Sequence, residues 1–194
     1  MSVHAGTHAD APLHVESSWR ASETLPADVF VGEVCVIALP RGADPGAAIS
    51  IGALRAMIEA VTGIAAAHAE RAEGTERTAR GFPTRLLCRT GHSVAHGAFP
   101  DAWPVLDAEA AQWLLESGLI LWGTDAPSVD ERTSKSLPVH HTLFRGGAYV
   151  LENLALDAVA PGTYELLAPP IALDGADAAP VRALLRALER ESER

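Results

Sequence analysis

The chain has 194 residues and a formal net charge of −10, and its composition is 48% hydrophobic and 21% charged. These proportions are typical of a globular protein, and the length fits one domain, residues 1–194, with its own hydrophobic core. The acidic balance argues against nucleic acid or an anionic membrane as a partner, because both bind to basic surfaces.

The two cysteines and the absence of long apolar runs bear on location. Cys35 and Cys88 lie within apolar segments, which predicts buried, reduced thiols and not a disulfide framework. No run reaches 18 apolar residues, and no charged-then-apolar segment opens the chain. We therefore expect a cytoplasmic protein without a membrane span or signal peptide.

The first stretch with candidate metal ligands runs from His4 to His14 and also contains His8 and Asp10. Imidazole and carboxylate groups are ligands of zinc, iron and manganese, but fully extended this stretch would span roughly 33 Å. A metal site therefore requires the chain to fold back, and Gly6 permits a bend because glycine tolerates positive φ. We predict a tight turn followed by an extended His8-x-Asp10 pair that shares one face. A histidine-rich tail is the alternative, although the interspersed Gly, Thr, Asp and Pro argue against it.

Residues 16–90 alternate between turns and regular structure. Residues 16–28 are polar and turn-like, and residues 29–39 are rich in β-branched side chains, which predicts a strand buried on both faces. Ser50 is positioned to cap a helix over residues 51–61, which ends at Gly63. Residues 84–90 predict the next strand.

Two segments around that strand have weaker signals. Residues 64–81 are alanine-rich and charged, which predicts a surface helix fragment or a mobile insertion with His68 as a solvated side chain. The loop at 91–104 contains His92 and His96 beside aromatic residues, so either histidine is a candidate for contact with substrate or metal. Chance occurrence on a surface loop is the competing interpretation.

The following segment resembles an α/β layer. Asp107 begins an amphipathic helix over residues 108–117, closed by Gly118, and an apolar strand at 119–123 follows after a minimal turn. Asp125 stands just beyond that strand, either as a site residue or as the start of an Asx turn.

The last third of the chain supplies one more residue of chemical interest. Residues 147–154 predict a strand, and Glu152 within it is costly to bury unless it is paired or bound to metal. We expect a further strand over 163–173 and a C-terminal helix over 179–190 with Pro180 in its first turn.

These residues together provide more ligands than one tetrahedral zinc ion requires. The surplus favours a two-metal hydrolytic site, with ions typically about 3.5–4 Å apart and one histidine left for acid–base work. The pool of candidates is His4, His8, Asp10, His14, His140 or His141, and Glu152.

The run from His4 to His14 resembles the motif of the cyclase family that includes bacterial kynurenine formamidases and isatin hydrolases. Further segments of this chain recur in the same order in the formamidases. They are 87–90 (LCRT), 123–130 (GTDAPSVD), Ser134-Lys135, His140-His141, 151–154 (LENL), 161–167 (PGTYELL) and 177–182 (DAAPVR).

The resemblance implies an α/β fold, a swivelling β/β/α domain with a mixed sheet flanked by helices. It also implies a small-molecule substrate and a homodimer or a larger homo-oligomer. Family members carry a longer segment before the motif, including a strand and a Trp-Pro-Gly-type stretch, whereas three residues precede His4 here. We therefore expect either a truncated sequence or a sheet with an exposed edge, a frayed His4, and aromatics from Trp19 or the 91–104 loop in the pocket.

The roles of the site residues follow from the resemblance alone. His140 is preferred over His141 because of its twelve-residue separation from Glu152, as in the formamidases. Two divalent ions are implied, zinc first and manganese as the alternative. By position, His4, His8 and Asp10 would bind one metal, Asp10 and Glu152 would bridge to a second that His140 completes, and His14 would be the acid–base residue.

The implied reaction is the hydrolysis of N-formyl-L-kynurenine to L-kynurenine and formate, a step of tryptophan degradation. One alternative is hydrolysis of isatin or another small cyclic amide or lactone. Another is a cyclase-fold binding protein without activity, which the short N-terminal segment would favour.

Overall fold

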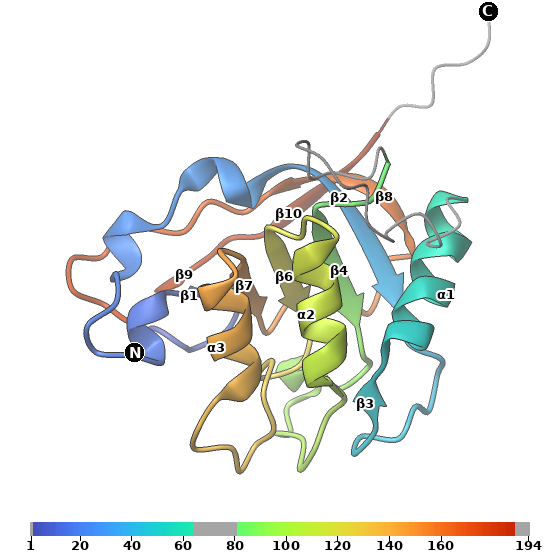
Figure 1. Ribbon diagram of the computed structural model, residues 1–194, viewed down its shortest axis with the longest axis horizontal. Coiled ribbons are helices and arrows are strands. Elements are labelled where there is room, and N and C mark those ends of the chain that lie inside the picture. Colours follow the sequence, from blue (N-terminus) through green and yellow to red (C-terminus); the bar gives the residue numbers. More distant parts are fainter. Residues whose placement is uncertain (1, 64–80, 189–194) are drawn as a thin grey trace, which may run out of the picture.

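The computed structural model describes residues 2–63 and 81–188, and its main element is an eight-stranded mixed sheet (Figure 1). The strand order is β10-β8-β2-β4-β6-β7-β1-β9. The strands are β1 (His8–Asp10), β2 (Val31–Ala38), β4 (Arg85–Arg89), β6 (Leu121–Thr124), β7 (Tyr149–Glu152), β8 (Gly162–Leu167), β9 (Ala178–Pro180) and β10 (Leu184–Ala187).

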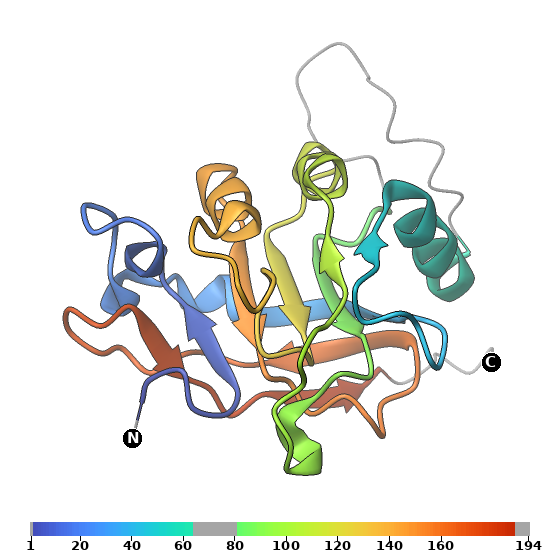
Figure 2. The ribbon, with the colours of Figure 1, turned by 90° about the horizontal axis from the view of Figure 1, so that it is seen from below.

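Three α-helices lie on the same side of this sheet (Figure 2). They are α1 (Ile51–Thr62), α2 (Ala108–Glu116) and α3 (Pro138–Arg145). Strands β3 (Ala48–Ile49) and β5 (Val105–Leu106) form a separate parallel pair. The α/β class with a mixed sheet and flanking helices is confirmed.

The centre of the sheet is parallel and its margins are antiparallel. Strands β2, β4, β6 and β7 pair in parallel, while β8 joins β2 and β1 joins β7 in the antiparallel sense. The carboxyl ends of β4, β6 and β7 therefore meet at one edge, where loops after parallel strands commonly form sites.

Alternating side chains of the central strands divide the core into two layers. On β2, Cys35 and Ile37 join the cluster that packs on the helices, whereas Val34 and Val36 join the cluster on the other face. Both faces of β2 are thus buried, as its continuous apolar sequence predicts. Cys88 on the neighbouring strand is also buried, and both cysteines are free thiols.

Local capping signals predicted two of the helices closely. The Ser50 side chain accepts a hydrogen bond from the Ala53 amide, and Gly63 ends α1 with a φ of 67°. Asp107 accepts from the Ala110 amide at the start of α2. The 64–81 segment with His68 lies outside the described residues, apart from Gly81.

The predicted C-terminal helix is wrong in the part of it that the structure describes. Ala178–Pro180 forms β9 against β1, and Leu184–Ala187 forms β10 against β8. Tertiary pairing overrides the helical periodicity here, because two strand edges are available to satisfy the backbone hydrogen bonds of this segment.

Helix α3 was absent from the sequence-based expectations. Its N-cap residue, Leu137, has a φ of 45° and offers no capping side chain, so the usual start signal is lacking. Pro138 at the first turn was the available clue.

The sequence led us to expect a sheet with an exposed edge, and β1 is not an edge strand. That strand pairs with β7 on one side and β9 on the other, and β9 and β10 end the sheet. No helix within residues 2–63 and 81–188 is long and apolar enough to cross a membrane.

Candidate metal centre

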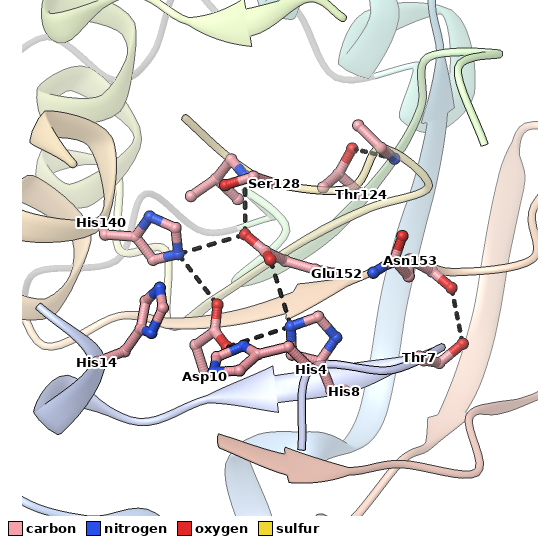
Figure 3. A network of polar contacts seen from close by, with 12 residues as sticks. His4, Thr7, His8, Asp10, His14, Thr124, Ser128, His140, Glu152 and Asn153 are labelled. Atoms are coloured by element: carbon pink, nitrogen blue, oxygen red, sulfur yellow. Dashed lines mark hydrogen bonds and ion pairs between the residues drawn. The ribbon is translucent and has the colours of Figure 1, made fainter. Parts of the chain in front are cut away.

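Six side chains from three separate segments converge at the edge of the sheet beside β1 and β7 (Figure 3). The N-terminal segment contributes four of them, α3 contributes one and the end of β7 contributes one. They are His4, His8, Asp10, His14, His140 and Glu152.

Strand register explains how the N-terminal motif meets Glu152. His8 on β1 lies directly opposite Glu152 on β7, and opposed residues of an antiparallel pair point to the same face. Asp10 is two residues further along β1, so it shares that face. The turn that returns His4 to the site contains Gly6 at a φ of 71°, as predicted for the bend.

The two carboxylate oxygens of Asp10 face different histidines: one oxygen faces His4 and His8, and the other faces His140. Its Oδ1 lies 3.1 Å from His4 Nδ1 and 3.2 Å from His8 Nε2. Its Oδ2 lies 3.0 Å from His140 Nε2. Asp10 is fully buried, so this carboxylate occupies the middle of the cluster.

The two carboxylate oxygens of Glu152, on the neighbouring strand, also face different histidines. Its Oε2 is 3.4 Å from His8 Nε2 and its Oε1 is 3.2 Å from His140 Nε2. The Val129 amide also donates to Oε1 at 2.8 Å, which fixes the carboxylate. Two buried carboxylates that each face both histidine groups have the arrangement expected of bridging ligands.

The donor set fits a divalent cation. His8 Nε2 and Asp10 Oδ1 are buried and approach to 3.2 Å, yet neither has a hydrogen-bond partner. Buried polar atoms without a partner are costly, and a shared cation would satisfy both. Ligand atoms of His4, His8 and Asp10 lie within 4.8 Å of one another, and so do those of Asp10, His14 and His140.

The charge balance of the cluster shifts the pKa values of its members. Burial alone would lower the pKa of His8, but the close contacts of its ring with the carboxylates of Asp10 and Glu152 raise that pKa to about 10. Burial would also lower the pKa of His140, but the contacts of its ring with Asp10, Asp130 and Glu152 hold that pKa well above its ordinary value. Burial would raise the pKa of Asp10, but the close contacts of its carboxylate with the rings of His140, His4 and His8 hold that pKa well below its usual range.

Asp177 belongs to the site and was missed as a site residue in the sequence, where it appeared only within the 177–182 motif. Its Oδ2 lies 3.1 Å from His4 Nε2 and 3.3 Å from His14 Nδ1. His4 is thus held by two carboxylates, which corrects the expectation of a frayed histidine. Only the pairing of β9 with β1 brings Asp177 here, and no local signal in the sequence encodes it.

The remaining candidates make their hydrogen bonds with other residues. The Asp125 carboxylate accepts hydrogen bonds from the Thr90 amide and hydroxyl and from the Gly91 amide, and it thereby ties β4 to the end of β6. The His92 Nδ1 contacts the Thr90 carbonyl at 3.0 Å. The His96 side chain lies outside the described part of the structure.

The adjacent histidines of α3 point to different places. His140 is fully buried and faces Asp10 and Glu152, whereas the His141 ring packs edge-on against Trp19 with 5.6 Å between ring centroids. Trp19 in turn borders a cavity of about 420 Å³, together with Arg20, Phe144, Arg145 and Tyr149.

Comparisons with known proteins show similarity over most of this chain. The putative cyclase family model matches residues 1–131. A kynurenine formamidase of Bacillus cereus is 40% identical over 186 residues, which are 96% of this chain and 77% of that protein. A kynurenine formamidase of Bordetella petrii is also 40% identical, over 97% of this chain and 78% of the relative.

Solved structures share the same fold. A potential metal-dependent hydrolase with cyclase activity matches with a TM-score of 0.71 at 29% identity, over 98% of this chain and 82% of the other. A predicted metal-dependent hydrolase from Bacillus stearothermophilus gives 0.67 at 31% identity, over 95% and 78%. Isatin hydrolase A from Labrenzia aggregata gives 0.71 at 24% identity, over 97% and 75%, and so shows the fold alone. The chain belongs to the putative cyclase family.

Proposed function

We propose that this protein is a metal-dependent amidohydrolase that converts N-formyl-L-kynurenine to L-kynurenine and formate. The observation that carries the proposal is the buried cluster in which Asp10 and Glu152 each face two groups of histidines. The substrate is the one named for relatives that are 40% identical over nearly the whole chain.

The proposed metal content is two zinc ions, with manganese as the alternative. His4 and His8 would hold one ion, His140 would hold the other, and the two carboxylates would be shared between them. Zinc is favoured because mixed imidazole and carboxylate ligands are typical of its hydrolytic sites. Such ions supply an activated water at neutral pH and polarise a carbonyl oxygen.

His14 is the proposed acid–base residue. Its side chain is 26% exposed, in contrast to the fully buried His140, and it lies at the edge of the cluster. In the reaction, a C–O bond forms to the formyl carbon and the C–N bond breaks. His14 would accept the proton that the attacking water loses and return it to the leaving aniline nitrogen.

The contacts of His14 suit that role. Its Nδ1 lies 3.3 Å from Asp177 Oδ2, so the carboxylate orients the ring. At the edge of the cluster, His14 can reach both the water and the departing nitrogen, and it stays free for proton transfer because it does not bind the metal.

The function is tested by measuring formate release from N-formylkynurenine with protein loaded with zinc or manganese, with isatin as the comparison substrate. We expect turnover of the formamide that stops when a chelator removes the metal. Absence of turnover by folded, metal-loaded protein would overturn the proposal, and faster hydrolysis of isatin would move the assignment to cyclic amides.

Two finer features are also proposed. We expect a homodimer or larger homo-oligomer, which sedimentation analysis of the purified protein measures directly. A cytoplasmic location is supported by Cys35 and Cys88, which are buried and unpaired as in proteins of reducing compartments. Fractionation of the source cells tests it.

A further inference from the structure

A third buried carboxylate, Asp130, lies behind the cluster and faces His140. It follows β6 in the chain and is only 1% exposed. The Val139 amide donates to its Oδ1 at 2.9 Å, and the His140 amide donates to its Oδ2 at 3.1 Å. The same Oδ2 lies 2.7 Å from Nδ1 of the His140 ring, which is the shortest contact that this ring makes with a carboxylate.

This contact determines which nitrogen of His140 faces the site. With Nδ1 donating its proton to Asp130, Nε2 is the atom directed at Asp10 and Glu152, 3.0 and 3.2 Å away (Figure 3). A metal-binding imidazole needs its outer N–H held by an acceptor, since that hydrogen bond fixes both the ring orientation and the tautomer.

The neighbouring histidine lacks such a partner. Nδ1 of His141 is buried without a hydrogen bond, and its ring lies against Trp19. Two identical side chains in sequence therefore differ in one respect that matters for metal binding, because only His140 has a carboxylate behind its ring.

Asp130 also sets the start of α3. The N-cap residue Leu137 offers no capping side chain, and the Asp130 carboxylate accepts from two first-turn amides in its place. The backbone of Asp130 is itself fixed, because its carbonyl accepts a hydrogen bond from the Trp103 ring at 2.9 Å. A carboxylate that is held on both sides in this way can position a ligand without moving.

We propose that Asp130 is a positioning residue that fixes the orientation and tautomer of His140 and thereby sets the affinity of the metal ion on the His140 side. The inference rests on the proposed function, in which His140 completes the second metal position. It predicts a selective effect, because His4 and His8 have no contact with Asp130 among the described interactions.

The experiment compares wild type with Asp130→Asn, which preserves the shape of the side chain and removes its charge. Metal is removed with a chelator and then restored stepwise with zinc, and the affinities of successive equivalents are measured by chelator competition. We expect the first equivalent to bind as in wild type and the second to bind about 10–100-fold more weakly.

Asp107→Asn is the matched control. Asp107 caps α2 through a 2.6 Å hydrogen bond, and asparagine caps helices about as well as aspartate. This variant should bind both equivalents normally. If Asp130 only caps α3, then Asp130→Asn lowers the melting temperature of the metal-free protein but leaves the rise in melting temperature caused by metal unchanged, which would overturn the inference.

Two further outcomes separate this inference from the function beneath it. A wild-type protein that takes up only one equivalent would overturn the inference together with the proposed content of two metal ions, whereas the hydrolytic function is tested separately by formate release. Two equivalents in wild type with an unchanged second affinity in Asp130→Asn would overturn the inference alone. Ring nitrogen-15 NMR of zinc-loaded wild type needs no variant: we expect a protonated Nδ1 and a metal-bound Nε2 in His140, and the reverse assignment would contradict the proposal.

Discussion

Each of three histidine rings in the cluster has one nitrogen held by an outer acceptor and the other directed at Asp10. The inner contacts converge on a single carboxylate, which explains why the rings cannot all be satisfied by hydrogen bonds alone. The outer acceptors are the Gly6 carbonyl for His8, Asp130 for His140 and Asp177 for His4. These outer acceptors therefore fix the orientation of the three rings, as outer hydrogen bonds do for metal-binding histidines.

Replacing His14 separates catalysis from metal binding. We expect His14→Ala to keep its metal content but to lower kcat by about 10²–10⁴-fold, because it removes the proton carrier and leaves the proposed ligands in place. The measurement is formate release together with elemental analysis. His92→Ala is the control, since His92 contacts the Thr90 carbonyl and none of the six cluster residues among the described interactions. Full activity in His14→Ala would contradict the acid–base role.

Replacing Glu152, unlike replacing His14, should lower the metal content as well as the activity. Glu152→Gln removes the charge that faces both His8 and His140, so we expect the protein to lose at least one bound metal ion and its activity together. Glu165→Gln is the control because Glu165 pairs with Arg186 on the β8–β10 margin of the sheet. Normal metal content in Glu152→Gln would show that metal binding does not need the negative charge of Glu152.

The stability of the metal-free protein should fall as the pH rises. The pKa of His8 is 6.5 in its ordinary state and about 10 in the folded chain, so its ion pairs contribute fully below pH 6.5 and are lost as the pH passes about 10. Metal affinity should rise over the same range, because the ion displaces protons from the histidines. Urea unfolding of chelator-treated protein across this window measures the slope. His8→Gln should flatten it, and an equal slope in that variant would rule out His8 as the cause.

At the scale of elements, long-range pairing positions the site. His8 and Glu152 are directly opposed only because β1 inserts between β7 and β9, which brings residues from both ends of the chain to one edge. The parallel centre of the sheet supplies the rigid support for that edge. Close packing there tolerates little added volume.

Gly123 on β6 is a sensitive point of this support. A Cβ at Gly123 would lie 2.4 Å from Leu87 Cδ2 and 2.9 Å from Leu154 Cδ1. We expect Gly123→Ala to lower the free energy of unfolding by about 1–3 kcal/mol through overpacking. Gly52→Ala in α1 is the control: its Cβ would meet Ser50 Oγ at 3.8 Å, and alanine favours helix by up to about 1 kcal/mol. Chemical denaturation measures both, and an unchanged stability for Gly123→Ala would show that the core can relax.

For the whole molecule, the interior holds an unusual concentration of ionisable groups. Three buried carboxylates and two buried histidines meet in one region, in a chain whose net charge is already −10. Divalent ions would offset the negative charge of that region and bind only the folded state. Metal content and global stability are therefore expected to be coupled.

Metal removal should lower the melting temperature reversibly. At a free zinc concentration of 100 times the dissociation constant, binding would stabilise the folded state by about 2.7 kcal/mol. Calorimetry of chelator-treated protein before and after restoring zinc measures the effect, with magnesium as a control ion that suits this histidine-rich set poorly. A melting temperature that does not change when zinc is added would contradict a metal site in the folded protein.

The sequence by itself determined the features that depend on local chemistry. The spacing from His4 to Asp10 with Gly6 between them encodes a turn and a shared strand face, and Ser50 and Asp107 encode helix starts. The types of the candidate ligands, imidazole and carboxylate, also follow from the residue identities alone. Local rules work here because each of these features is decided by residues within one or two turns of each other.

Only the tertiary structure decided which distant residues meet. The position of Asp177 beside His4 and His14, the contact of the His140 ring with Asp130, and the pairing of Leu184–Ala187 as a strand depend on tertiary partners. The helical periodicity near the C-terminus was a misleading local signal. The start of α3 lacked the usual local signal, because its N-cap residue has no capping side chain. A buried hydrogen bond or an open strand edge outweighs propensities of a few tenths of a kcal/mol per residue, so the assembled sheet sets the final geometry of the site.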